Sequence, residues 1–100
     1  MDTYEVEVWT DFTDVELKQC ENLIEVLTHS VPDTVARDGL GLPYFRIDDN
    51  YEYDEETFLA SGRIGVLVGV IGHLDAREVR AELEDTFHAF EFVPKSCIIG

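Results

Sequence analysis

The fold is decided by the stretch Arg63-Ile64-Gly65-Val66-Leu67-Val68-Gly69-Val70-Ile71-Gly72. No polar side chain occurs between Ile64 and Ile71, and the many branched residues favour a strand over a helix. A short apolar run bounded by glycines indicates a central strand that is covered on at least one face. It is too short to cross a bilayer, which needs about 20 residues. By the two-residue period of a strand, Gly65 and Gly69 share one face with Leu67 and Ile71, so that face is partly bare.

The charge of the chain is its second unusual property. Twenty-two acidic residues against seven basic residues give a formal net charge of −15, and only two of the basic residues are lysines. A compact domain of this length is roughly 33 Å across, whereas fifteen charges correspond to about 25 Å of duplex DNA. Such a field disfavours direct binding to nucleic acid or to an anionic membrane. It favours a basic protein partner or a very salty solvent.

Length and cysteine usage indicate one compact domain, residues 1–100, in the cytoplasm. Domains usually contain about 50–250 residues. The acidic N-terminus is not followed by the apolar segment of a signal peptide. Cys20 and Cys97 belong to no CxxC pair, so two ordinary thiols are the simpler interpretation, although a disulfide between them stays open.

The segments before the central run predict a strand, a helix and a second strand. Residues 3–9 alternate between apolar and polar side chains, as in a half-buried strand. Thr13 and Glu16 form a capping-box pattern, which predicts a helix from Thr13 to about His29. Residues 30–43 are rich in turn signals, and residues 44–48 alternate again. Residues 49–61 fit either an extended hairpin arm or a short helix capped by Asp54.

The central run and the segments after it repeat the order strand, helix, strand. Asp75 as N-cap, with Glu78 three residues later, predicts a second helix whose buried stripe is Ala76, Val79, Leu83 and Phe87. Residues 89–93 predict the last strand, and the apolar tail 95–99 is suited to dock as an edge strand. Two strand–helix–strand units predict an α+β, ferredoxin-like split βαβ fold (βαββαβ), with a four-stranded antiparallel sheet and two helices on one face. The open sheet face is then expected to carry Glu5, Glu7, Trp9, Leu67, Ile71 and Glu91.

The acidic run 48–56 is the strongest candidate for a site. A calcium loop is disfavoured, because Tyr53 replaces the required glycine and Leu59 stands where the bidentate glutamate belongs. Tyrosines interleaved with carboxylates suit an Arg- and Lys-rich partner, while a solvated loop without function is the alternative. Together with acids of the second helix, the candidate partner-binding residues are Asp48, Asp49, Tyr51, Glu52, Tyr53, Asp54, Glu55, Glu56, Glu78, Glu82, Glu84 and Asp85.

Catalysis, metals and cofactors find no support in the sequence. No nucleophile elbow, P-loop, dinucleotide-binding glycine pattern or HExxH motif occurs, so we expect no enzyme activity and no cofactor. His29, His73 and His88 have no ligand spacing, so we expect no metal. Acylphosphatases share the expected fold, but their phosphate-binding loop needs basic and glycine residues. At that position this chain has Thr10-Asp11-Phe12-Thr13-Asp14.

Small acidic proteins encoded by phages against restriction or CRISPR machinery resemble this chain in size and charge. The resemblance implies an inhibitor or decoy, of the anti-CRISPR or anti-restriction type, that mimics nucleic-acid charge. If the protein is phage-encoded, its expected location is the host cytoplasm. Its partner would be a basic, nucleic-acid-handling protein such as a nuclease or a CRISPR effector complex, bound by a monomer or a homodimer. Two alternatives stay open. One is a halophile-type acidic domain that acts in oligomerisation or ligand regulation, and the other is an interaction module for a basic partner unrelated to nucleic acid.

Overall fold

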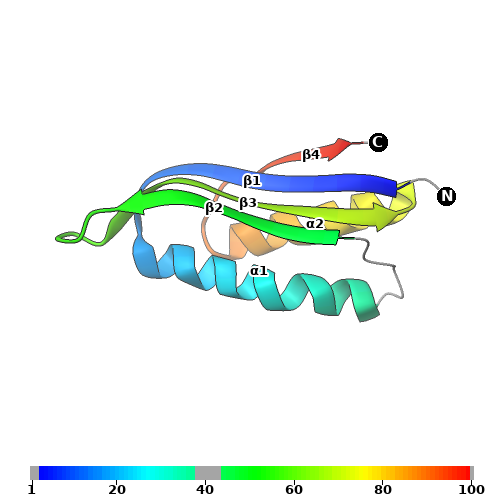
Figure 1. Ribbon diagram of the computed structural model, residues 1–100, viewed down its shortest axis with the longest axis horizontal. Coiled ribbons are helices and arrows are strands. Elements are labelled where there is room, and N and C mark those ends of the chain that lie inside the picture. Colours follow the sequence, from blue (N-terminus) through cyan, green and yellow to red (C-terminus); the bar gives the residue numbers. More distant parts are fainter. Residues whose placement is uncertain (1–2, 38–43, 100) are drawn as a thin grey trace.

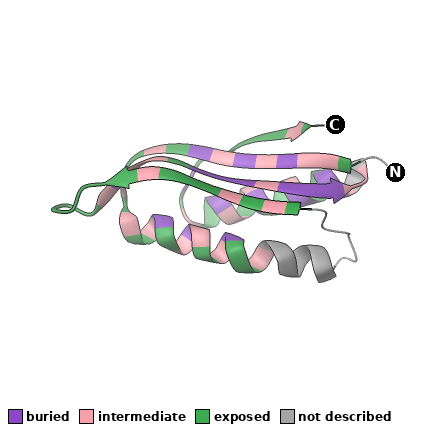
Figure 2. Ribbon diagram, viewed as in Figure 1, coloured by how far each residue is buried: buried purple, intermediate pink, exposed green. Residues whose placement is uncertain are grey.

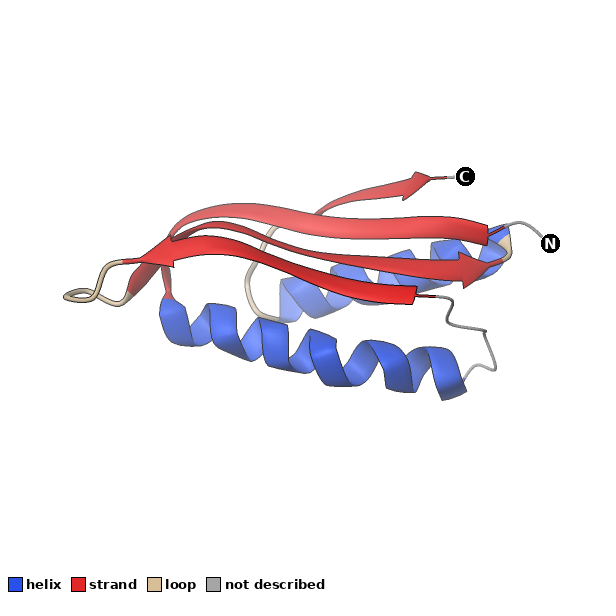
Figure 3. Ribbon diagram, viewed as in Figure 1, coloured by secondary structure: helices blue, strands red, loops and turns tan. Residues whose placement is uncertain are grey.

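The computed structural model describes residues 3–37 and 44–99, apart from the side chains of residues 31–37, 73 and 74. Its elements in chain order are β1 (Thr3–Glu16), α1 (Leu17–Arg37), β2 (Tyr44–Tyr53), β3 (Leu59–Ile71), α2 (His73–Ala89) and β4 (Lys95–Ile99). The strands form one antiparallel sheet in the order β2-β3-β1-β4. Both helices cover the same face of this sheet (Figures 1 and 3). The predicted ferredoxin-like βαββαβ fold is therefore confirmed.

The core lies between the two central strands and the helices. β1 and β3 are paired so that Val6 faces Val68 and Val8 faces Val66, and all four side chains are buried. Figure 2 shows this buried band along the middle of the sheet. The predicted stripe of α2 is confirmed, because its four members are buried against the sheet. β3 is thus the central, one-face-covered strand that its apolar run predicts.

The molecule is more elongated than its length predicts. Its principal extents are 50 × 23 × 19 Å, with a radius of gyration of 14.0 Å. The long strands cause this shape, because each residue adds about 3.3 Å along a strand. The fifteen net charges are therefore spread over 50 Å rather than over the predicted 33 Å.

With Thr13 as N-cap, the capping box predicts a helix that begins at residue 14, and α1 begins three residues later, at Leu17. β1 continues through a bulge between Phe12 and Val15, and Glu16 pairs with Leu59 of β3. The amide of Leu17 then donates to the carbonyl of Phe58 at 2.9 Å. Pairing with β3 therefore takes up the residues that would otherwise form a helix cap. α1 also runs past Pro32 to Arg37, while the turn signals at 38–43 lie outside the described residues.

Residues 49–61 form a hairpin, which decides between the two predicted conformations. β2 extends to Tyr53, five residues beyond the predicted strand, and β3 begins at Leu59. Their antiparallel pairing runs from Tyr44 opposite Gly69 to Tyr53 opposite Ala60. Extension of the sheet pairs residues 49–53 with β3, which a single helical turn after Asp54 cannot do.

Two predictions about the C-terminal third are wrong. α2 begins at His73 with Gly72 as N-cap, so Asp75 lies in its first turn instead of capping it. Residues 89–93 are not a strand, because the Phe87 carbonyl accepts the amides of Phe90 at 3.1 Å and Phe92 at 3.0 Å. Glu91 there has a φ of 64° and lies off the sheet, contrary to its expected place on the open face. The last strand is the tail 95–99, which pairs with β1 at the edge, as its apolar residues predict.

Gly62 is a position where only glycine fits. Its φ is +149°, and a Cβ there would lie 2.5 Å from the Cα of Tyr51 on β2. We expect Gly62→Ala to lower the free energy of unfolding by about 2–4 kcal/mol, measured by urea denaturation. Gly65→Ala is the control, because its φ is ordinary and its Cβ would lie 3.2 Å from Trp9 Cβ. A loss at Gly62 no larger than at Gly65 would contradict this geometry.

Candidate functional site

The end of β2 and the turn that follows it, which together we call the hairpin tip (residues 52–58), have a defined shape. The Asp54 amide donates to the Leu59 carbonyl at 3.0 Å, and the Phe58 amide donates back to the Asp54 carbonyl at 2.8 Å. The Asp54 carboxylate accepts from the Glu56 amide at 2.7 Å. Asp54 therefore caps a single turn of chain, and it does not begin a helix. Figure 1 shows that the tip projects past both helices at one end of the molecule.

The hairpin tip combines carboxylates with exposed aromatic rings. Glu52, Asp54, Glu55 and Glu56 are all exposed. Tyr53 and Phe58 keep 48% and 58% of their surface exposed, which is unusual for large apolar side chains. No basic residue occurs in the sequence between Arg46 and Arg63. The tip is therefore a local concentration of negative charge with two rings available for contact.

The other candidate residues of the acidic run lie elsewhere. Asp48 is on the sheet face away from the helices, where it pairs with Arg46 at 3.3 Å. Asp49, one residue on, is exposed on the opposite face. Tyr51 is half-buried, with its ring 5.9 Å from that of Phe12, and burial raises the pKa of its hydroxyl. Tyr51 therefore packs against the core, unlike Tyr53.

The candidate acids of α2 form a separate surface. Glu78, Glu82 and Asp85 are exposed on the helix. Glu84 is half-buried, pairs with Arg80 at 3.4 Å and accepts the Ser96 hydroxyl at 2.8 Å, so it ties α2 to β4. The hairpin tip and α2 lie in opposite halves of the molecule (Figure 1). The structure thus does not bring the twelve candidates into one patch.

The sheet face away from the helices, which we call the open face, is a third surface. Alternation and register place on it Glu5, Glu7, Trp9, Asp11, Tyr44, Arg46, Asp48, Arg63, Leu67, Ile71, Lys95, Cys97 and Ile99. The predicted members of β1 and β3 are all present. The other residues were not predicted. For Lys95, Cys97 and Ile99 the reason is that residues 89–93 were expected to form the last strand.

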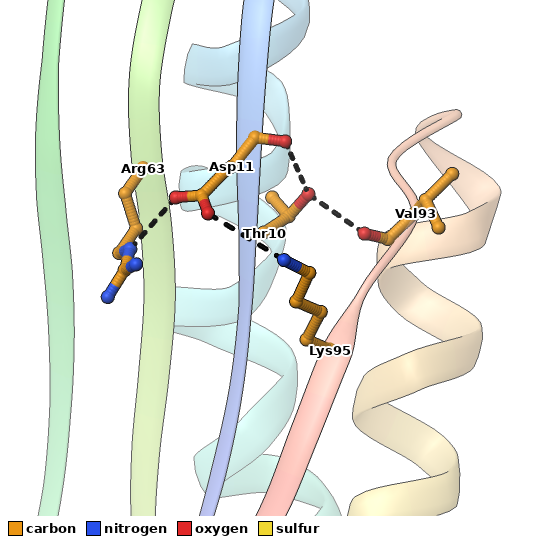
Figure 4. A network of polar contacts seen from close by, with 5 residues as sticks. All are labelled: Thr10, Asp11, Arg63, Val93 and Lys95. Atoms are coloured by element: carbon orange, nitrogen blue, oxygen red, sulfur yellow. Dashed lines mark hydrogen bonds and ion pairs between the residues drawn. The ribbon is translucent and has the colours of Figure 1, made fainter.

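An ion-pair cluster crosses three strands of the open face. Asp11 pairs with Arg63 at 3.0 Å and with Lys95 at 4.0 Å (Figure 4). The Arg63 guanidinium lies 4.1 Å from the Trp9 ring centroid and the Lys95 ammonium 4.9 Å from it. These are cation–π distances. Beneath the cluster, the hydroxyl of buried Thr10 donates to the Val93 carbonyl at 3.0 Å. Two cations held by Asp11 therefore restrain the indole ring on the open face.

The bare glycines of β3 explain how the aromatic rings lie on this face. A Cβ on Gly69 would collide with the Tyr44 ring at 2.7 Å, and one on Gly65 would press on Trp9. The Tyr44 ring therefore uses space that Gly69 leaves free. The Tyr44 hydroxyl donates to the Glu5 carboxylate, and this hydrogen bond is the main cause that raises the pKa of Tyr44.

Metal and thiol chemistry are limited in the described part of the chain. Residues 3–37 and 44–99 contain no group of three His, Cys, Asp or Glu side chains arranged to hold a metal ion. Cys20 is buried, and burial is the main cause that raises the pKa of its thiol. Cys97 is free and exposed on the open face. Among the helices described, none has the length and apolar character needed to span a membrane.

Comparison with known proteins identifies the fold and no family. No protein-family model and no curated protein matches the chain. A dimeric ferredoxin-like protein of unknown function from Thermobifida fusca matches with a TM-score of 0.60 and 9% identity, covering 100% of this chain and 92% of that one. A similar dimeric protein from Jannaschia sp. matches with a TM-score of 0.58 and 14% identity, over 97% and 98% of the two chains. The de novo designed protein Ferredog-Diesel matches with a TM-score of 0.54 and 17% identity, over 96% and 84%.

Proposed function

We propose that this protein is a non-enzymatic acidic inhibitor that binds the basic surface of a nucleic-acid-handling protein in place of nucleic acid. The observation that carries the proposal is the hairpin tip, which presents carboxylates and two exposed rings beyond the rest of the fold. A projecting tip of this kind can enter a groove lined by arginine and lysine. Aromatic contact area beside charge is typical of binding surfaces.

The spacing of charge along the molecule supports mimicry of nucleic acid, once the observed length of 50 Å replaces the predicted length of about 33 Å. Fifteen net charges over 50 Å give about one charge per 3.3 Å. One strand of DNA carries a charge per 3.4 Å or so, and the duplex carries twice that density. The protein therefore matches a single strand in line density. A groove that accepts single-stranded nucleic acid, or one strand of a duplex, is the better complement.

The test is competition for a basic partner. Fluorescently labelled DNA would be bound to each of several purified restriction endonucleases and to an RNA-guided nuclease complex, and the protein would then be titrated in. We expect displacement from at least one of them, weakening about tenfold or more between 50 and 200 mM salt, because charge dominates the contact. Displacement that is insensitive to salt would overturn the proposal. So would displacement no greater than that by a variant in which Glu52, Glu55 and Glu56 are changed to Gln and Asp54 to Asn.

A halophile-type domain that acts in oligomerisation is the second candidate. It is favoured by the spread of carboxylates over α1, α2, the hairpin tip and the open face, since a specific site needs charge in one place only. The proteins from Thermobifida fusca and Jannaschia are described as dimeric, which fits oligomerisation here too. In this case the charge keeps the surface hydrated in concentrated salt and has no particular target.

Thermal unfolding separates the two candidates. For the inhibitor we expect a cooperative transition both in about 10 mM and in 1 M KCl, with a modestly higher Tm at 1 M. The Debye length falls from about 30 Å to 3 Å over this range, so repulsion between surface carboxylates is screened only at the higher salt. A protein that folds cooperatively in molar salt alone would favour the halophile-type domain. Circular dichroism melts at both salt concentrations are sufficient.

A further inference from the structure

We propose that the open face binds the open face of a second copy of this chain, so that the protein is a homodimer with its two sheets packed together. This inference concerns a surface other than the hairpin tip and does not rest on the proposed function. The argument comes from the charge, the side chains and the area of the open face.

Away from the hairpin, the open face is nearly neutral in a strongly acidic protein. This part carries four acids and three basic residues, and alternation adds Glu16 and Glu52 toward the hairpin, whereas the whole chain has 22 acids and 7 basic residues. Its basic residues are already paired with carboxylates of the same face, Arg46 with Asp48 and both Arg63 and Lys95 with Asp11. Two copies of a −15 chain repel each other, and this repulsion is smallest when near-neutral surfaces meet. Nucleic acid would have to compete with Asp11 for the same cations.

The centre of the open face is apolar and held in place. In the strand register Leu67 lies between Gly65, which pairs with Trp9, and Gly69, which pairs with Tyr44. The Tyr44 ring fits against Gly69. Tyr44 and Ile99 are exposed to 37% and 44%, and no element of the described chain covers this face. The Trp9 ring is fixed by two cations and Tyr44 by its bond to Glu5. Rings that are already ordered lose little conformational entropy when they become buried in an interface.

The area is sufficient for a stable dimer. The four strands contain 14, 10, 13 and 5 residues. At about 3.3 Å per residue and 4.8 Å between strands, they present roughly 650 Å² on one protomer. Face-to-face packing would then bury about 1,300 Å² in total, within the range of roughly 1,200–2,000 Å² for specific interfaces. Such packing leaves the helices, their carboxylates and both hairpin tips on the outside, in contact with solvent.

The test is the oligomeric state of two matched variants. Leu67→Lys puts a charge at the centre of the open face, and Phe58→Lys makes the same kind of change at the hairpin tip. Lysine is chosen because it lowers the net negative charge, so a weaker dimer cannot be attributed to added repulsion. By sedimentation velocity in 0.5 M KCl, we expect the wild type and Phe58→Lys to have twice the 11.4 kDa chain mass. Leu67→Lys should be monomeric, with a dimer dissociation constant at least 100-fold higher.

The thiol of Cys97 reports on the same face without a change in sequence. Cys97 is exposed on the open face, while Cys20 is buried, so N-ethylmaleimide should modify Cys97 first. We expect the modification of wild-type Cys97 to slow at least tenfold as protein concentration rises through the dissociation constant. Leu67→Lys should react at the fast rate throughout.

Two outcomes would overturn the inference. One is a wild type that stays monomeric at all concentrations. The other is a dimer that survives Leu67→Lys and leaves Cys97 reactive, which would indicate pairing through the edge strands β2 or β4. Leu67→Lys should still displace DNA from the basic partner, because its hairpin tip is intact. Failure of the dimer and failure of the inhibitor are therefore distinguishable.

Discussion

Neutralising Glu52, Asp54, Glu55 and Glu56 together is expected to weaken displacement of DNA from the basic partner at least 100-fold. All four side chains are exposed at the hairpin tip, and each opposite-charge contact in a desolvated groove contributes about 1 kcal/mol or more. Four such contacts amount to roughly 4 kcal/mol, or nearly a thousandfold in affinity. The changes are Glu→Gln and Asp54→Asn. Asparagine keeps the side-chain oxygen that accepts the Glu56 amide, so the turn stays formed.

A charge-matched variant makes this result specific. Glu21→Gln, Glu25→Gln, Glu78→Gln and Asp85→Asn remove the same four charges from exposed positions on α1 and α2. We expect this variant to compete within about threefold of the wild type, because its four positions lie on the helices and outside residues 52–58. Equal losses in both variants would mean that net charge, and not the tip, carries binding. An unchanged affinity of the tip variant would contradict the assignment of the site.

The sheet and its core were predictable because their signals are local. Alternation in β1 and the apolar run in β3 place each side chain on the correct face, since the strand period is fixed at two. The helix starts were not predictable to the residue. Thr13 and Asp75 have acceptable cap side chains, but pairing of β1 with β3 and the Gly72 turn decide where the helices begin. Those are tertiary effects that a capping pattern does not contain.

The last strand shows how a two-residue period can mislead. Phe90 and Phe92 alternate with polar neighbours, as strand residues do, yet both amides donate to the Phe87 carbonyl at the end of α2. Phe92 is buried through a turn, with its ring 5.4 Å from that of Phe12. Glu91 takes the left-handed conformation that usually belongs to glycine. A non-glycine residue in that conformation gives no signal in the sequence.

The candidate site was predictable as a segment but not as a surface. The run 48–56 is acidic in any conformation, while its division into tip, open face and packing side depends on the hairpin register. Tyr51 and Tyr53 look equivalent in the sequence, since they are two residues apart on one strand face. Only Tyr51 reaches the core, because α1 and Phe12 lie under it and the strand extends past that cover at Tyr53. The Asp11 cluster was missed because it needs the register of three strands at once.

Phe87→Ala is expected to produce the largest loss of stability among single core substitutions. Phe87 is the largest fully buried side chain, on the face of α2 that packs against the sheet. Removal of a buried ring costs about 3–5 kcal/mol, from a total stability of roughly 5–15 kcal/mol for a domain. For a chain of this length, we expect the Tm to fall by about 20 °C. Thermal melts followed by circular dichroism measure the change.

The matched control is Phe58→Ala, which removes the same ring from a position that is 58% exposed. Its free energy of unfolding should stay within about 0.5 kcal/mol of the wild type. The difference between the two variants therefore isolates burial from the loss of a phenyl group. Because Glu84 on the same helix accepts the Ser96 hydroxyl, loosening of α2 also weakens the tether of β4. Because Cys20 belongs to the same buried cluster as Phe87, we expect its thiol to react faster with maleimide in Phe87→Ala. Equal melting of the two variants would contradict the packing of α2.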